Sequence, residues 1–288
     1  MTSSLEDIVD FPVWLDAMRQ PDAMQAAAYE SCSADFRASL KTAIAFGFHL
    51  WRESAAITES RLVNPRTGFS HMFASRPAAW TLALLSPGYA SPARFLAAIL
   101  PSILAGVDKI AVAALNAPPS SPLCTAFELA GLEDIFILTS GEHDASDLLH
   151  ELHETDADGR ILFFPMPSSS PSPCFSAIRQ TAESLKLPLW SDSPAPRLYI
   201  ACSDGNKNSG DVPRRDIIAW AHGDAEFLDH ADSSAAAWFT PYSAGTFHRS
   251  EDVPAVRSFG PGMEACWIHP LLDPDYFRTR ALCAYLNR

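Results

Sequence analysis

The chain has 288 residues, 48% of them hydrophobic and 19% charged, and it carries a formal net charge of −13. This composition is ordinary for a folded protein and excludes a mostly disordered chain. An acidic surface of this kind repels phosphate backbones and anionic lipid, so we expect neither nucleic acid nor a membrane among the partners. No stretch reaches the roughly 18–20 consecutive apolar residues of a membrane helix.

The start of the sequence, MTSSLEDIVDF, lacks the charged and apolar regions of a secretion signal, which favours a cytoplasmic location. The six cysteines are far apart and form no CxxC pair. This spacing excludes a zinc ribbon and a disulfide framework, and it is typical of separate buried thiols.

The first two thirds of the chain alternate between helix and strand patterns. In residues 33–54, apolar side chains recur about every four positions, which predicts an amphipathic helix. Two extended runs follow at 69–74 and 80–85. We then predict helices at 92–105, 121–130, 141–153 and 174–185, and strands at 109–114, 134–138 and 160–164. Apolar strands alternating with helices predict an α/β fold, with a parallel sheet covered on both faces.

The last third is less regular. We predict a strand at 197–202, an exposed loop at 203–211 and an amphipathic helix at 213–230. Short strands are expected at 235–239 and 246–248, and a helix from residue 275 to the end.

The turn at residues 86–91, which contains Pro87, Gly88 and Tyr89, joins a predicted strand to a predicted helix. Ligands of open α/β sheets bind beyond the carboxyl ends of the strands, and helix amino termini attract anions. A single glycine is a weak nucleotide motif, however, and a plain connecting turn explains the same residues.

Two polar clusters are candidates for metal or acid–base sites. His150 and His153 share a helix face, but they have no third ligand and no HExxH pattern, which favours solvated histidines. On the predicted helix at 213–230, His222 and Glu226 share a face with Asp229 or His230. This face could hold a base or a metal, or could simply be solvated.

Several runs, taken in order, resemble histidinol dehydrogenase. These are LLSPGYASP at 84–92, FLAAILPSILAGVDKIAVAALNAP at 95–118 and AFELAGLEDIFILTSGEHDA at 126–145, with weaker echoes before and after them. The resemblance is collinear over most of the chain. It implies two incomplete Rossmann-like domains with mostly parallel sheets and flanking helices. Residues 80–195 would be inserted into a second α/β domain formed by 1–79 and 196–288, with the strands at 109–114, 134–138 and 160–164 as neighbours.

The family oxidises histidinol with NAD, using zinc and a glutamate–histidine pair. The resemblance places that glutamate on Glu226, but it places the histidine on Phe227, which cannot transfer a proton. The resemblance places the family's cofactor-contacting tyrosine, glutamine and asparagine on Leu85, His143 and Pro167. The acid–base pair is therefore broken, and NAD is left open as a cofactor.

The zinc-site positions also depart from the family. A segment with two ligands has no counterpart between residues 205 and 216, and the tail with the last one has none after Arg288. The aspartate ligand falls on Val256, and a substrate-contacting histidine falls on Met263. Because the zinc ligands are lost together, we expect no bound zinc.

These features predict a non-catalytic paralogue that binds or senses a small molecule. The alternative is an NAD-dependent oxidoreductase that acts on a small alcohol or aldehyde. The ligand is expected beside Pro87, Gly88, Tyr89, Gly141 and His143, with Glu226 approaching from the other domain. A homodimer is left open.

Overall fold

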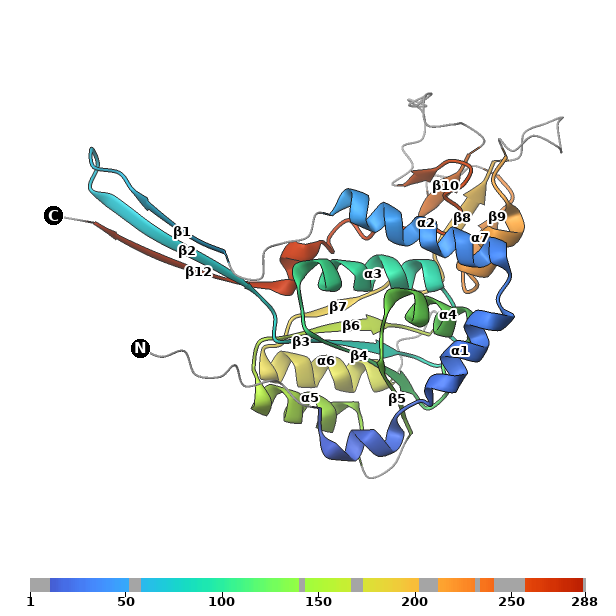
Figure 1. Cartoon of the computed structure of the whole chain (residues 1–288), viewed down its shortest axis with the longest axis horizontal. Coiled ribbons are helices and arrows are strands. Elements are labelled where there is room, and N and C mark those ends of the chain that lie inside the picture. The colour runs from blue at the N-terminus through green and yellow to red at the C-terminus, as the bar shows by residue number, and fades with distance from the viewer. Residues whose placement is uncertain are drawn as a thin grey trace.

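The computed structural model describes residues 11–51, 58–139, 143–166, 173–201, 212–230, 234–240 and 257–286. These residues form a mixed α/β structure in which parallel sheets are flanked by helices (Figure 1). Its three sheets contain five, four and three strands in the described part of the chain. No described helix has both the length and the apolarity needed to cross a membrane.

The central sheet has the order β5-β4-β3-β6-β7, and all of its strands are parallel. The strands are β3 (Trp80–Leu85), β4 (Lys109–Leu115), β5 (Asp134–Leu138), β6 (Gly159–Phe164) and β7 (Leu189–Ser191). The strands predicted at 80–85, 109–114, 134–138 and 160–164 are therefore confirmed. The expectation that the last three are neighbours is wrong for β6, because β3 lies between β4 and β6.

Helices cover both faces of the central sheet (Figure 1). One face packs against α3 (Pro92–Ala105) and α4 (Ser121–Ala130), and the other packs against α5 (Ala145–Thr155), α6 (Pro173–Leu185) and the 3₁₀ helix η1 (Val13–Met18). Every residue of β3 and β6 is buried, as expected for strands with both faces covered. The predicted helices are confirmed here, although α5 begins four residues later than expected because Asp144 caps it.

The second sheet has the order β11-β10-β8-β9 and is also parallel. Its strands are β8 (Arg197–Ile200), β9 (Glu226–Leu228), β10 (Ala237–Phe239) and β11 (Ser258–Phe259). It shares a core with α2 (Ala34–Leu50), α7 (Arg215–Ala221) and α3, and α1 (Asp22–Ser31) lies beside α4. Helix α3 serves both cores, because Phe95 and Ile99 face the central sheet while Leu96 and Leu100 face the second one.

The predicted helix at 213–230 is wrong beyond Ala221. Residues 222–225 form a turn, and β9 follows it. The turn forms because His222 is drawn into the core and Asp224 pairs with Arg94, and a continuous helix cannot satisfy both contacts. Glu226 therefore lies on a strand, and the helix face expected to unite His222, Glu226 and His230 does not exist. The strand predicted at 246–248 and the loop predicted at 203–211 lie outside the described residues.

The third sheet is antiparallel and projects from the body as an arm (Figure 1). It consists of β1 (Thr58–Val63), β2 (Phe69–Pro77) and β12 (Arg278–Leu286). The helix expected from residue 275 is wrong, because only the 3₁₀ turn η2 (Pro274–Phe277) precedes β12. Pairing along the whole of β2 overrides the local preference of an Ala- and Leu-containing segment for a helix.

Candidate functional site

A hollow of about 190 Å³ lies at the carboxyl ends of β3 and β4. Residues 85–90 and 117–120 form its walls, and Ala114 and Leu123 also line it. The turn after β3 is at the point where the strand order reverses, since β4 lies on one side of β3 and β6 on the other. This is where open α/β sheets bind their ligands.

The turn after β3 keeps its shape because of Gly88, which has a φ of +82°. Side chains rarely adopt this left-handed conformation. The Tyr89 amide closes the turn by donating to the Ser86 carbonyl at 3.2 Å. Pro87 is half-buried and Gly88 is exposed, so these two residues lie at the mouth of the hollow.

Tyr89 lies inward from the turn and is buried. Its ring lies 5.1 Å from that of Phe164, the last residue of β6, and its hydroxyl donates to Asp192 Oδ2 at 3.1 Å. Burial raises the pKa of Tyr89 well above its ordinary value. Tyr89 therefore closes the side of the hollow toward β6 and β7, and its hydroxyl already has a partner.

Two helices begin beside the hollow, and their amino termini differ. Ser91 Oγ accepts from the Arg94 amide at 3.3 Å and donates to the Ala221 carbonyl, which completes the cap of α3. Ser120, at the start of α4, makes no such cap, and its Oγ is buried without a hydrogen-bond partner. The first turn of a helix also leaves amides without intrahelical acceptors. The hydrogen-bonding groups that the hollow offers are thus concentrated at Ser120 and in the first turn of α4.

A buried ionic network lies beneath the turn and joins the two sheets. Arg94, which is fully buried, donates through Nη1 to Asp192 Oδ2 at 2.6 Å and to the Ser193 carbonyl at 2.7 Å, and through Nη2 to Asp224. Burial opposes the charge of Arg94, but Tyr89 and the two aspartates raise its pKa above the ordinary value. Burial raises the pKa of Asp192, and the neighbouring guanidinium limits that rise. The two ion pairs of Arg94 hold the end of β7 against the turn after α7.

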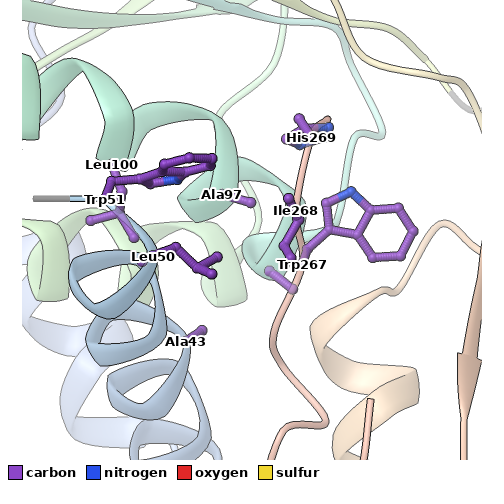
Figure 2. Close-up of a pocket in the computed structure, with 10 residues that line it drawn as sticks. Ala43, Leu50, Trp51, Ala97, Leu100, Trp267, Ile268 and His269 are labelled. Atoms are coloured by element: carbon purple, nitrogen blue, oxygen red, sulfur yellow. The ribbon is translucent and has the colours of Figure 1, made fainter. Parts of the chain in front are cut away.

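Two histidines complete the network. His222 Nε2 lies 3.2 Å from the Glu264 carbonyl, and His269 Nε2 lies 3.0 Å from the Arg94 carbonyl, so each ring donates a hydrogen bond. Burial lowers the pKa of both rings to about 3. Figure 2 shows His269 beside Trp267, lining a small cavity between α2, α3 and the segment 267–269. That cavity has room for about one water molecule, so a substrate cannot reach the ring there.

Of the residues expected at the ligand site, the structure brings Pro87, Gly88 and Tyr89 together at the hollow. His143 does not line it. Its ring stacks on Trp14 with 4.6 Å between centroids. Glu226 does not approach the hollow either, because it lies at the start of β9, where its side chain is 61% exposed and its Oε2 is 3.5 Å from Arg197 Nε. Gly141 lies outside the described residues.

Ser120, Arg94 and Asp192 were not predicted as site residues. An SSP sequence before an apolar helix signals the amino terminus at Ser120. The ionic network gives no such signal, because Arg94 is 98 positions from Asp192 and 130 positions from Asp224 in the chain.

The described residues do not fit the zinc site of the family that the sequence resembles. Met263 and Phe227 pack against the core shared by α2, α3 and the second sheet. In the described ranges, no three His, Cys, Asp or Glu side chains are grouped so that they could hold a metal ion. Val256 and residues 202–211 lie outside these ranges.

Comparison with known proteins finds similarity in structure only. No protein-family model matches the sequence, and no curated protein matches it significantly. Histidinol dehydrogenase from Elizabethkingia anophelis superposes with a TM-score of 0.52 and 12% identity, over 93% of this chain and 77% of that one. This similarity shows a dehydrogenase-type α/β fold.

Two further structures match more weakly. A 3,6-anhydro-L-galactose dehydrogenase has a TM-score of 0.37 and 14% identity, over 70% of this chain and 39% of that one. Lactaldehyde dehydrogenase from Escherichia coli has a TM-score of 0.37 and 11% identity, over 76% of this chain and 46% of that one.

Proposed function

We propose that this chain is a non-catalytic protein that binds a small molecule in the hollow between the turn after β3 and the start of α4. The observation that carries this proposal is the chemistry of the lining. Among the described residues that line the hollow, Tyr89 alone has a titratable side chain, and its hydroxyl donates to Asp192. Ser86 and Ser120 also line the hollow, but no described lining residue is a base that could activate either hydroxyl.

The lining also indicates the class of ligand. Ser120 and the first turn of α4 favour a carboxylate or phosphate group, while Leu85, Ala114 and Leu123 favour a short apolar portion. A volume of about 190 Å³ is below the roughly 300–1,000 Å³ of pockets that enclose drug-sized ligands. We therefore expect a small organic acid or phosphate ester. A whole dinucleotide would have to lie mostly outside the hollow.

The second candidate is an NAD-dependent oxidoreductase that acts on a small alcohol or aldehyde. The dehydrogenase-type fold favours it. Against it, Leu85 is buried at the hollow and His143 stacks on Trp14, so neither residue offers a polar group to a cofactor there. NAD, if bound, would supply hydride transfer, and the turn at Gly88 would contact it.

A thermal-shift screen with small carboxylates, phosphate esters, NAD and NADP tests both candidates. A ligand at 100 times its Kd stabilises by about 2.7 kcal/mol. We expect Ser120→Leu to abolish the shift, because it fills the hollow without removing a helix cap. The control Ser121→Leu changes the next, exposed residue and should keep the shift.

Two outcomes would contradict the proposal. One is a shift that is the same in Ser120→Leu and the wild type. The other is NADH formation from small alcohols or aldehydes by the wild-type chain, which would establish the oxidoreductase instead.

A further inference from the structure

The outer edge of β7, the last strand of the central sheet, is not paired with any other described strand (Figure 1). The Pro188 carbonyl accepts a hydrogen bond from β6 at 3.0 Å, and the Asp192 amide donates one to β6 at 2.9 Å. Because the hydrogen-bonding direction alternates along a strand, the backbone groups of Trp190 also face β6. Those of Leu189 and Ser191 face the opposite way, where no described residue bonds to them.

The opposite edge of the same sheet is closed by the chain itself. The Gln20 amide donates to the Ile135 carbonyl of β5 at 2.8 Å, and Arg19 forms a β-bridge with Phe136. An open edge presents unpaired donors and acceptors that a further strand can use, and proteins usually cover or shorten such an edge. β7 is short, with three residues, but the outward backbone groups on it remain available.

A groove of about 390 Å³ lies between β7 and α6. The side chains that line it belong to α6, to β7 and to the turn between them: Phe175, Arg179, Ala182, Glu183, Leu187, Leu189 and Ser191. The side chains of β7 that line the groove therefore lie on the α6 side of the sheet. A strand added beside β7, at a spacing of about 4.8 Å, would present its alternate side chains to the same side and hence to the groove.

We propose that the open edge of β7 binds an extended segment of a partner protein, which adds to the five-stranded sheet as a further strand. The outward backbone groups of Leu189 and Ser191 supply the main-chain hydrogen bonds. Phe175, Ala182 and Leu187 supply an apolar surface for one large side chain of the segment. Main-chain bonds that give affinity, combined with a pocket for alternate side chains that gives specificity, are the two elements of recognition by strand addition.

Charge favours a basic segment over a second copy of this chain. The helices α5 and α6 cover this face of the sheet and contain four acidic side chains and one arginine, and Lys186 follows α6. Arg179 already donates to Glu183 at 2.8 Å, and the Glu183 side chain remains 65% exposed. A second copy carries the same net charge of −13 and would be repelled. The segment should therefore place a lysine or arginine near Glu183, next to its apolar residue.

Amide hydrogen exchange, resolved by NMR for each residue, tests the edge without any variant. In the full chain alone, the amides of Leu189 and Ser191 should exchange at least about 100-fold faster than the amide of Trp190, which faces β6. The probe is a synthetic peptide chosen from a displayed library of random seven-residue sequences by its binding to the full chain. It should protect the amides of Leu189 and Ser191 and leave that of Trp190 unchanged.

Two variants test the contacts of the peptide. Ser191→Pro removes an outward amide hydrogen, a change that edge strands accept, and should weaken peptide binding at least tenfold. Glu183→Lys reverses the exposed charge at the groove and should weaken the binding of a basic peptide at least threefold. The matched control is Glu128→Lys, which makes the same charge change at an exposed position of α4 on the other side of the sheet and should leave the affinity unchanged.

Three results would overturn the proposal. The first is protection of the Leu189 and Ser191 amides in the chain alone. Protection that grows with the concentration of the chain would assign the edge to a second copy instead. The second is a library that yields no peptide protecting these two amides. The third is a peptide whose affinity is the same for the wild type, Ser191→Pro and Glu183→Lys, because such a peptide binds elsewhere.

Discussion

A fall from about pH 6 to about pH 5 should destabilise this fold steeply, because His222 and His269 are buried as neutral rings. Burial lowers each pKa from the ordinary 6.5 to about 3. In this window the unfolded rings take up protons and the folded rings do not, so stability is lost as the pH falls. Each ring then removes about 1.2 kcal/mol from the free energy of unfolding, and the two together remove about 2.4 kcal/mol.

Urea unfolding followed by tryptophan fluorescence at the two pH values measures this change. His222→Gln and His269→Gln should each reduce the pH-dependent loss by about 1.2 kcal/mol, whatever they do to stability at neutral pH. His150→Gln is the matched control, because His150 is exposed on α5 and solvent hydrates its ring in both states. Asp192, whose pKa burial raises, acts in the opposite direction, which is why the variants are needed to isolate the histidines.

The prediction would be refuted if both histidine variants kept the wild-type pH dependence. That result would mean that the folded rings take up protons near their ordinary pKa, and hence that water reaches them.

Two further predictions concern single positions in the core. Arg94→Met leaves two aspartates buried without their cation and should destabilise the fold by about 3–5 kcal/mol in urea titrations, whereas Arg214→Met, in an exposed cluster, should have a barely measurable effect. Equal effects would show that the network is solvated. Gly159→Ala would place a methyl group inside the Trp80 indole and should prevent folding, while Gly131→Ala meets no atom and should lower stability by only about 1 kcal/mol, from its φ of +69°. Soluble Gly159→Ala protein with the wild-type Tm would contradict this.

The central sheet could be predicted because its signals are local. β3 and β6 are apolar at nearly every position, and the helices between the strands begin and end at Ser, Pro and Gly residues such as Ser91 and Gly131. Strand order is not local. That β3 separates β4 from β6 depends on where the chain returns after β5, which no motif in the sequence specifies.

The errors in the last third have the same origin. β12 is a strand because it pairs with β2, which is about 200 positions earlier in the chain. The helix at 213–230 stops at Ala221 because Arg94, 130 positions away, takes Asp224. Both segments are compatible with a helix in isolation, and tertiary pairing decides against it.

The resemblance in sequence predicted where the turn lies but not the side chains that surround it. The turn after β3 could be placed at the carboxyl edge of a sheet, and the structure has it there at the point where the strand order reverses. What decides its chemistry is the inward position of Tyr89, which is fixed by Asp192 and Phe164 from distant strands. The turn thus lies at the edge of a parallel sheet while one inward side chain closes it toward β6 and β7. Under the proposed function, the identity of the ligand has to be sought from the lining of the hollow, because a fold does not specify a ligand.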